Sequence, residues 1–208
     1  QLVKVGITGT NGKTTIAHLI YSILESAGRK SALLGTVGYN TGARAVESNA
    51  TTPDPVTLAE ATREMVDAGR THLVMEVSSH ALDQDRIAGL DFRVAVFTNI
   101  TGDHIDYHKT IENYVAAKRR LFESLGQGAL AVINREDPYA DEMARGAVSS
   151  GAAVCYYGLS DECDCGARIE RLDDDGVHIH VSLDGEEIEI HSPMIGKHNV
   201  LNALAAIA

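Results

Sequence analysis

The stretch GITGTNGKTT, residues 6–15, constrains the fold of this 208-residue chain more than any other segment. An apolar run at 2–7 precedes it and predicts a buried strand, while residues 14–27 carry apolar side chains at helical spacing. A strand, a glycine-rich turn, Lys-Thr and a helix in this order are typical of a phosphate-binding loop. Glycines let the backbone turn its N–H groups toward phosphate oxygens, and the helix N-terminus adds partial positive charge there.

The glycine spacing in this loop departs from the usual motif. Ile7 occupies the place where the motif has its first glycine, Gly6 comes one residue too early, and Gly9 lies inside the loop. We still expect a nucleotide site, with a plain tight turn as the alternative: Lys13 can reach the outer phosphates, and Thr14 can offer its hydroxyl to magnesium. The candidate nucleotide-binding residues are Gly9, Thr10, Asn11, Gly12, Lys13, Thr14 and Thr15.

Strands and helices alternate along most of the chain. Further strands are predicted at 31–37, 72–77, 94–98, 129–134 and 152–156, further helices at 57–68, 111–125 and 139–148, and a short hairpin or excursion at 39–48. This alternation predicts an α/β fold, a P-loop domain with a mostly parallel sheet covered by helices. From Ala167 the rhythm changes to short strands joined by Asp-Gly turns, which predicts a small antiparallel β-meander before a final helix. The meander strands are expected at 167–172, 177–183 and 186–191.

The composition argues against some classes of function. A formal net charge of −11 argues against a protein that wraps nucleic acid. No apolar run approaches the length of about 18 residues that a membrane span needs, and no signal peptide is visible. The cysteines Cys155, Cys163 and Cys165 are odd in number and lack an obvious second metal pair, so we expect reduced thiols in a cytoplasmic protein.

Two polar segments follow predicted strands. Glu76 ends one strand, and Asp103, His104, Asp106 and His108 follow another. Ligands bind beyond the carboxyl ends of strands in open α/β sheets, so Glu76 should face the same crevice as the loop, where a carboxylate suits magnesium. An acid satisfied by nearby N–H groups, or solvated loop residues, are the alternatives. The His-x-x-x-His spacing can suggest zinc, but no third protein ligand is evident, so magnesium is favoured.

Six blocks of sequence occur in the order of a known family. They are GTNGKTT, TTPDP, MEVSSHALDQDR, TNITGDHIDYH, YVAAKRRLF and GKHNVLNALAA. Together they resemble the central ATP-binding domain of the Mur ligases, and the TTPDP and EVSSHAL blocks point to the MurE type. The resemblance spans Val5 to Ala206. It also accounts for the shifted glycine, because the loop of this family is Gly-x-x-Gly-Thr-Asn-Gly-Lys-Thr.

The resemblance implies an ATP-dependent ligase of peptidoglycan precursor synthesis. Such an enzyme adds the third amino acid to UDP-N-acetylmuramoyl-L-alanyl-D-glutamate through an acyl phosphate. A carboxylate is a poor electrophile until phosphorylation supplies a leaving group, and cations must offset the repulsion between the two anions that meet. The implied cofactors are ATP, Mg²⁺ and a CO2-derived carbamate on Lys118. The implied partners are UDP-N-acetylmuramoyl dipeptide and an amino acid. Apart from the resemblance, we expect no nucleic-acid partner, no membrane span and a monomeric protein.

The family's site residues carry over to matching positions. Lys13 would contact the phosphates, Thr14 and Glu76 would hold the first magnesium ion, and His104 a second. Lys118 would become a carbamate that helps to place the second ion, because a lysine loses its proton readily when it is desolvated; an exposed helical lysine is the alternative. Lys13, Glu76, His104 and Lys118 are therefore the expected catalytic residues.

Two further sets match ligand-binding positions of the family. The set for the UDP-muramoyl dipeptide is Thr51, Thr52, Ser78 and Arg86. The set for the adenine side is His198, Asn199 and Asn202. The fork of Arg86 can bind both oxygens of a carboxylate, and asparagine can both donate to and accept from the edge of adenine. For Asn199, a helix N-cap is the alternative, and both roles can coexist.

The domain organisation also follows from the resemblance. Ligases of this type resemble three-domain proteins, so residues 1–208 are expected to form the central domain alone, an excised fragment without the UDP-binding and amino-acid-binding domains. Such a fragment should bind nucleotide weakly and ligate nothing at a useful rate. A folylpolyglutamate synthase-like ligase is the alternative enzyme, which the TTPDP and EVSSHALDQDR blocks argue against. A non-catalytic nucleotide-binding module is the other alternative, against which the four catalytic candidates argue.

Overall fold

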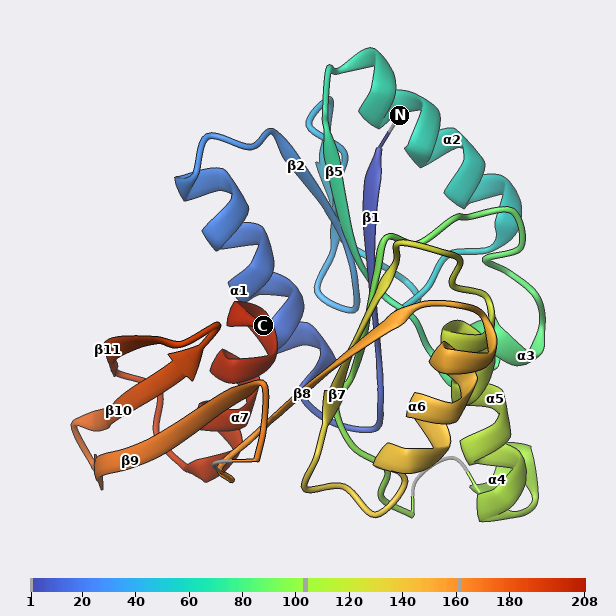
Figure 1. The fold of residues 1–208 in the computed structure, drawn as a ribbon. Helices are drawn as coiled ribbons and strands as arrows, with labels where there is room; N and C mark the ends of the chain where they lie inside the picture. Colours follow the sequence, from blue (N-terminus) through green and yellow to red (C-terminus); the bar gives the residue numbers. More distant parts are fainter. Residues whose placement is uncertain (1, 103–104, 161) are drawn as a thin grey trace.

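A mixed β-sheet runs through the chain, and helices cover both of its faces (Figure 1). The computed structural model describes residues 2–102, 105–160 and 162–208. Within them the strands are β1 (Val3–Thr8), β2 (Ser31–Leu34), β3 (Tyr39–Asn40), β4 (Ala45–Val46), β5 (His72–Glu76), β6 (Val94–Phe97), β7 (Leu130–Asn134), β8 (Ala153–Gly158), β9 (Cys165–Asp173), β10 (Gly176–Leu183) and β11 (Glu186–Ser192). The helices are α1 (Lys13–Ser26), α2 (Pro55–Asp67), α3 (Ser79–Asp83), α4 (Ile105–His108), α5 (Ile111–Glu123), α6 (Ala140–Ser149) and α7 (Lys197–Ile207).

The pairing of the strands confirms the predicted fold class. The order across the sheet is β11-β10-β9-β8-β7-β6-β1-β5-β2-β3-β4. The six central strands, β2, β5, β1, β6, β7 and β8, pair in parallel. β9, β10 and β11 form the predicted antiparallel meander, and β3 pairs with β4 in the expected hairpin. The meander continues the main sheet through a short parallel pairing of β9 with the end of β8.

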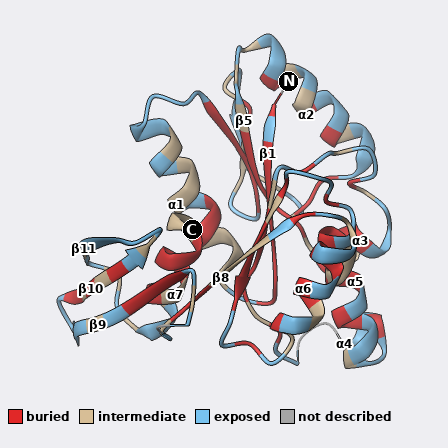
Figure 2. Cartoon of the chain, in the orientation of Figure 1, coloured by how far each residue is buried: buried red, intermediate tan, exposed pale blue. Residues whose placement is uncertain are grey.

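Successive residues of the central strands pack on opposite faces of the sheet, as the pleat requires. In β5, Leu73 and Met75 belong to the core beneath α2, α5 and α6, whereas Val74 belongs to the core beneath α1 and α7. Figure 2 shows most of these central strands buried between the two helical layers, while β8 is only partly buried. Burial on both faces explains why the strands are apolar throughout and could be predicted from the sequence.

Local chemistry explains where the elements depart from their predicted bounds. α2 begins at Pro55, before the predicted start at 57, because the Asp54 side chain accepts hydrogen bonds from the first-turn N–H groups and proline suits the first helical position. β2 ends at Leu34 rather than at 37, because a turn begins at Gly35, whose N–H donates to the Gly38 carbonyl. The short helices α3 and α4 were not predicted, since a single turn leaves no periodic signal.

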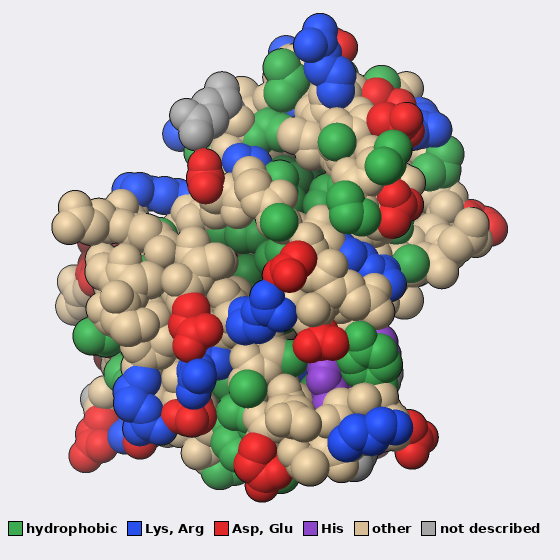
Figure 3. Space-filling view, turned by 90° about the vertical axis from the view of Figure 1, so that its right-hand side faces the viewer, with side chains coloured by type: hydrophobic (Ala, Val, Ile, Leu, Met, Phe, Trp, Pro, Cys, Tyr) green, Lys and Arg blue, Asp and Glu red, His purple; other side chains and the backbone are tan. Residues whose placement is uncertain are grey.

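One face of the molecule carries many side chains of both charges. On the face that carries α2, α5 and α6, acidic and basic side chains are interspersed (Figure 3). Several of them pair, including Arg63 with Asp67 and Arg119 with Glu123 along single helices. None of the helices in the described part of the chain is long and apolar enough to cross a membrane.

The three cysteines are free thiols, as expected. Burial raises the pKa of Cys155 to about 11 and that of Cys165 to about 12. Because the thiolate is the reactive form of cysteine, both side chains are inert near neutral pH.

We expect Phe97→Ala to be strongly destabilising. Phe97 is fully buried at the end of β6, with its ring edge-on to Phe122 at 6.3 Å between centroids. Truncating a buried phenylalanine costs about 3–5 kcal/mol, whereas Val148→Ala on an exposed face should change stability by no more than about 0.5 kcal/mol. Urea unfolding of both variants measures the difference. Equal midpoints would contradict the placement of Phe97 in the core.

Candidate nucleotide-binding site

The glycine-rich loop crosses the carboxyl end of β1 and leads into α1. Two of its residues must be glycine: Gly9 has φ 143° and Gly12 has φ 89°. A Cβ atom on Gly9 would lie 1.8 Å from the Thr98 hydroxyl, and one on Gly12 would lie 2.5 Å from Oδ1 of Asn202. Gly12 caps α1 without a side-chain hydrogen bond, so no cap side chain occupies the first-turn N–H groups that bind phosphate at helix N-termini.

Two residues at the end of β6 fix the loop in place. The Asn99 carbonyl accepts from Thr10 N at 2.7 Å, and its side-chain oxygen accepts from Asn11 N at 3.0 Å. The Thr98 hydroxyl donates to the Asn11 carbonyl at 2.7 Å. Sequence reasoning missed both residues, although both lie at or just after the end of a predicted strand.

Two lysines converge on the inner side of the loop. Lys13 Nζ donates to the carbonyls of Gly9 at 3.0 Å and Thr10 at 2.8 Å. Lys118 Nζ, from α5, donates to the same Gly9 carbonyl at 2.9 Å and lies 4.4 Å from the ring centroid of Tyr114. Lys118 is 1% exposed, so the exposed-lysine alternative is wrong. The two amines therefore meet on one carbonyl at the inner side of the loop.

Glu76 lies beside the start of α1, as predicted. Its carboxylate is 1% exposed and accepts from the Thr14 hydroxyl at 2.9 Å. Thr36 adds two further bonds, from its backbone N–H at 2.8 Å and its hydroxyl at 3.1 Å. Its carboxylate is thus hydrogen-bonded, as the alternative held, yet it also lies against the predicted magnesium ligand Thr14. A carboxylate and a hydroxyl are hard oxygen donors that fit magnesium.

The polar segment after β6 can be followed only in part. Asp103 and His104 lie outside the described residues. Asp106 is exposed, whereas His108 is 5% exposed and packs 5.2 Å from Tyr114 between ring centroids, so a solvated loop position is wrong for His108. No cluster of three or more His, Cys, Asp or Glu side chains within 2–102, 105–160 and 162–208 could hold a metal ion.

The proposed dipeptide set gathers beyond the end of β5. The Thr52 hydroxyl donates to the Glu76 carbonyl at 2.9 Å and accepts from Ser78 N at 2.9 Å. Arg86 Nη1 donates to the Thr52 carbonyl at 3.2 Å, and Thr51 lies 3.1 Å from the Thr36 hydroxyl between oxygens. Thr52 thus links Ser78 and Arg86 to the Glu76 backbone, and Thr51 is linked to the Glu76 carboxylate through Thr36.

The proposed adenine set lies on the other side of the loop. A cavity of ≈ 360 Å³ opens between the loop and α7, and His198 and Asn202 line it together with Asn11 and Tyr157. Asn199 does not line it; its side chain accepts from Asn202 Nδ2 at 3.1 Å and so orients that side chain. The N-cap of α7 is Gly196, so the N-cap alternative for Asn199 is wrong.

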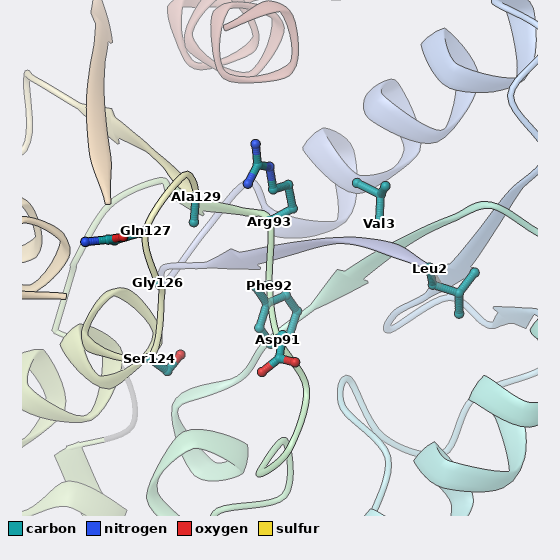
Figure 4. Close-up of a pocket in the computed structure, with 9 residues that line it drawn as sticks. All are labelled: Leu2, Val3, Asp91, Phe92, Arg93, Ser124, Gly126, Gln127 and Ala129. Carbon is teal, nitrogen blue, oxygen red and sulfur yellow. The ribbon is translucent and has the colours of Figure 1, made fainter. Parts of the chain in front are cut away.

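A second cavity, of ≈ 480 Å³, lies at the opposite, amino end of β1 (Figure 4). Its lining includes Leu2, Val3 and Phe92, and also Arg93, which directly precedes β6. None of the predicted site residues lines this cavity. We therefore do not take it as the candidate nucleotide site, although its volume exceeds that of the cavity beside α7.

We expect Gly12→Ala to weaken ATP binding at least about tenfold, or ~1.4 kcal/mol. Its Cβ would displace Asn202, in addition to straining a positive φ. Gly89→Ala is the matched control, because Gly89 has φ 82° with nothing within 4 Å of an added Cβ. Both variants should lose stability by about 1–2 kcal/mol from backbone strain, but only the first should lose ATP affinity in calorimetry. Equal affinities would contradict the placement of Asn202 against the loop.

A phosphate-binding loop and a buried acid at the carboxyl edge of a mostly parallel sheet define a P-loop nucleotide-binding α/β protein. Comparison with known proteins narrows this class. The family model for the Mur ligase middle domain matches residues 7–208, so the chain belongs to the Mur ligase family, as its sequence blocks predicted.

Relatives of known name resemble the whole chain. A UDP-N-acetylmuramoyl-L-alanyl-D-glutamate–2,6-diaminopimelate ligase of Halalkalibacterium halodurans is 42% identical over 211 residues, which cover 100% of this chain and 43% of that protein. The ligase of the same name from Bacillus cereus is also 42% identical and matches 100% of this chain and 43% of its own length. The chain thus spans less than half the length of these relatives.

Solved structures agree with this assignment. A structure of a ligase with the same name is 33% identical, has a TM-score of 0.89, and is matched over 99% of this chain and 42% of its own. Folylpolyglutamate synthase of Mycobacterium tuberculosis, at 19% identity and a TM-score of 0.73 over 100% of this chain and 54% of its own, shares the fold. The predicted MurE-type likeness is confirmed by the first of these structures.

Proposed function

We propose that this chain is the ATP-binding middle part of a ligase that joins an amino acid to UDP-N-acetylmuramoyl-L-alanyl-D-glutamate. The single observation that carries the proposal is the hydrogen bond between Thr14 and Glu76. It lies beside the glycine-rich loop, whose Thr10 carbonyl accepts a hydrogen bond from Lys13. Two oxygen atoms of the kind that bind magnesium, one from a hydroxyl and one from a carboxylate, lie beside a loop of the kind that binds phosphate. From the names of the relatives, the amino acid is 2,6-diaminopimelate.

The loop residues would bind and orient ATP. The N–H groups of the loop and of the first turn of α1 would receive the phosphates, and Lys13 would turn from the Gly9 and Thr10 carbonyls to the outer phosphate. Thr14 and Glu76 would hold magnesium, which supplies charge neutralisation at the phosphates when bound. The D-glutamyl carboxylate would then attack the γ-phosphorus, ADP would leave, and an amine would displace phosphate from the acyl phosphate.

Lys118 has a distinct proposed role. Its amine is 1% exposed and bonds the Gly9 carbonyl beneath the loop at 2.9 Å. Burial in general disfavours the charged form of a lysine, which makes a buried lysine a suitable residue for reaction with CO2. A neutral amine can add CO2 and release one proton to form a carbamate, an anion that Lys13 and a metal ion would stabilise. His104 is proposed as a ligand of that second metal ion on the strength of the family motif alone.

UDP-N-acetylmuramoyl-L-alanyl-D-glutamate, which we call the acceptor substrate, would lie beyond the end of β5. Thr51, Thr52 and Ser78 offer hydroxyl groups, and Arg86 offers a guanidinium whose fork suits a carboxylate. In the free chain Gln84 occupies that guanidinium, with its Oε1 2.9 Å from Arg86 Nε. A substrate carboxylate would therefore replace Gln84 on Arg86.

The test uses the natural protein that carries this chain. Supplied with ATP, Mg²⁺, UDP-N-acetylmuramoyl-L-alanyl-D-glutamate and 2,6-diaminopimelate, it should form the tripeptide product and one ADP per product. A folate substrate with glutamate should give no product. Ligation of glutamate to the folate instead would replace this proposal by the folylpolyglutamate synthase alternative, and ATP binding without any ligation would favour the non-catalytic module. The 208 residues alone should bind ATP weakly and show no useful turnover.

A further inference from the structure

We propose that Thr36 is a positioning residue that couples the magnesium site to the acceptor-substrate site. This inference rests on the proposed function, because it assumes that Glu76 holds magnesium and that Thr51 contacts the acceptor. Thr36 touches both residues: its oxygen lies 3.1 Å from Glu76 Oε2 and 3.1 Å from the Thr51 hydroxyl. No other described side chain has a hydrogen bond to both.

The two bonds from Thr36 fix the rotation of the Glu76 carboxylate. The backbone N–H holds Oε1 at 2.8 Å, and the hydroxyl holds Oε2 at 3.1 Å. Oε2 is also the atom that accepts from Thr14 at 2.9 Å. Thr36 therefore holds Oε2 in the position from which Glu76 and Thr14 can share one cation, as a residue behind a metal ligand does.

The backbone places Thr36 at this position by a close approach. β2 ends at Leu34, and the turn from Gly35 to Gly38 carries Thr36 over the Glu76 carboxylate. A Cβ atom on Gly35 would lie 2.3 Å from Glu76 Oε1. Glycine is thus required for the Thr36 N–H to reach the carboxylate.

The direction of the hydroxyl chain follows from hydrogen-bond chemistry. An ionised carboxylate only accepts, so Thr36 donates to Glu76 and its lone pair accepts from Thr51. Each bond in such a chain polarises the next, and the effect grows as water is removed. Glu76 is 1% exposed, whereas Thr36 is exposed in the free chain. A substrate seated on Thr51 would shield Thr36 from water and hold its hydroxyl on Glu76, which would keep the carboxylate oriented toward Thr14 and so favour magnesium binding.

The coupling is reciprocal, since an acceptor that tightens magnesium binding must itself bind more tightly when magnesium ATP is present. The variants Thr36→Val and Thr36→Ser separate the hydroxyl from the backbone N–H. Valine keeps the shape and the N–H but removes the hydroxyl, and serine restores the hydroxyl. Thr62→Val is the matched control, because the Thr62 hydroxyl donates to the Leu58 carbonyl within α2, away from the site.

The experiment titrates Mg²⁺ into each variant of the natural protein at fixed ATP, with and without saturating UDP-N-acetylmuramoyl-L-alanyl-D-glutamate, and measures ATP binding by calorimetry and ligation kinetics. In the wild type and in Thr62→Val, the acceptor should lower the half-saturating Mg²⁺ concentration several-fold. In Thr36→Val, that concentration should rise about tenfold, the size expected for one lost hydrogen bond to a charged group, and the acceptor should no longer shift it. KM for Mg²⁺ should change more than kcat, and Thr36→Ser should behave as the wild type.

Three results would overturn the inference while leaving the proposed function intact: an unchanged Mg²⁺ dependence in Thr36→Val, a Thr36→Ser variant that resembles Thr36→Val, or no effect of the acceptor on Mg²⁺ affinity in an active wild type. A wild type that neither binds magnesium ATP nor ligates would instead contradict the proposed function. Thermal unfolding of each variant shows whether a loss of magnesium affinity comes from misfolding. If Thr36→Val is misfolded, the comparison of Thr36→Ser with the wild type tests the inference.

Discussion

Replacing Lys13 by alanine should lower the rate of acyl-phosphate formation by about 10³-fold in the natural protein that carries this chain. Lys13 is the loop cation beside Thr14, and its amine already lies within 3.0 Å of two loop carbonyls at the mouth of the site. Without it, the D-glutamyl carboxylate and the γ-phosphate meet with one positive charge fewer in a partly dehydrated site, where charge is screened least. Rapid-quench measurement of ADP release in a single turnover reports this step.

Two variants sharpen the Lys13 experiment. Lys30→Ala removes an exposed lysine after α1 and should leave the rate unchanged. Lys13→Arg keeps the charge but replaces a compact ammonium by a planar fork, so we expect it to recover only a small part of the rate. A Lys13→Ala protein that releases ADP as fast as the wild type would contradict the assignment of the loop as the catalytic phosphate site.

Replacing Lys118 by alanine should be the second most damaging change, with a loss of about 10²–10³ in ligation rate. The reason is that Lys118 would act as a carbamate anion beneath the loop, where its amine now bonds the Gly9 carbonyl at 2.9 Å. Removal of CO2 from the buffer should lower the wild-type rate and leave the residual rate of the variant unchanged. A short carboxylate such as acetate should restore part of the variant's activity, because it can occupy the space of the carbamate.

The Lys118 prediction has a readout apart from activity. Native mass spectrometry at alkaline pH should show the mass of one bound CO2 on the wild type and none on Lys118→Ala. Arg120→Ala, two residues away on the half-exposed face of α5, is the control for effects on the helix. Full activity of Lys118→Ala, or wild-type activity that is indifferent to CO2, would show that the buried amine has only a structural role.

The central sheet could be predicted from sequence because its strands are buried on both faces. That burial makes the strands apolar throughout, and the carboxyl-edge rule then correctly placed Glu76 beside the loop. Lys118 is buried on α5 together with Tyr114 and Phe122. Lysine as a residue type favours exposure, so the resemblance to the family, which assigned Lys118 to the site, was the better guide.

Several site residues could not be predicted because their contacts join distant segments. The bonds of Thr36 to Glu76, Asn99 to Asn11 and Tyr114 to Thr10 span 40, 88 and 104 positions, and no periodic pattern marks them. Thr36 was not predicted for a second reason. The predicted strand at 31–37 included Thr36, whereas β2 ends at Leu34. With the correct strand end, the carboxyl-edge rule would have pointed to Thr36 as well.

A crystal structure of this chain with magnesium and a non-hydrolysable ATP analogue tests the central claim most directly. The account predicts the outer phosphates over the loop within bonding distance of Lys13, and one magnesium ion bound by the Thr14 hydroxyl and a Glu76 oxygen. The adenine should occupy the cavity beside His198 and Asn202. Nucleotide bound elsewhere, for example in the cavity at the amino end of β1, or magnesium away from Glu76, would contradict it.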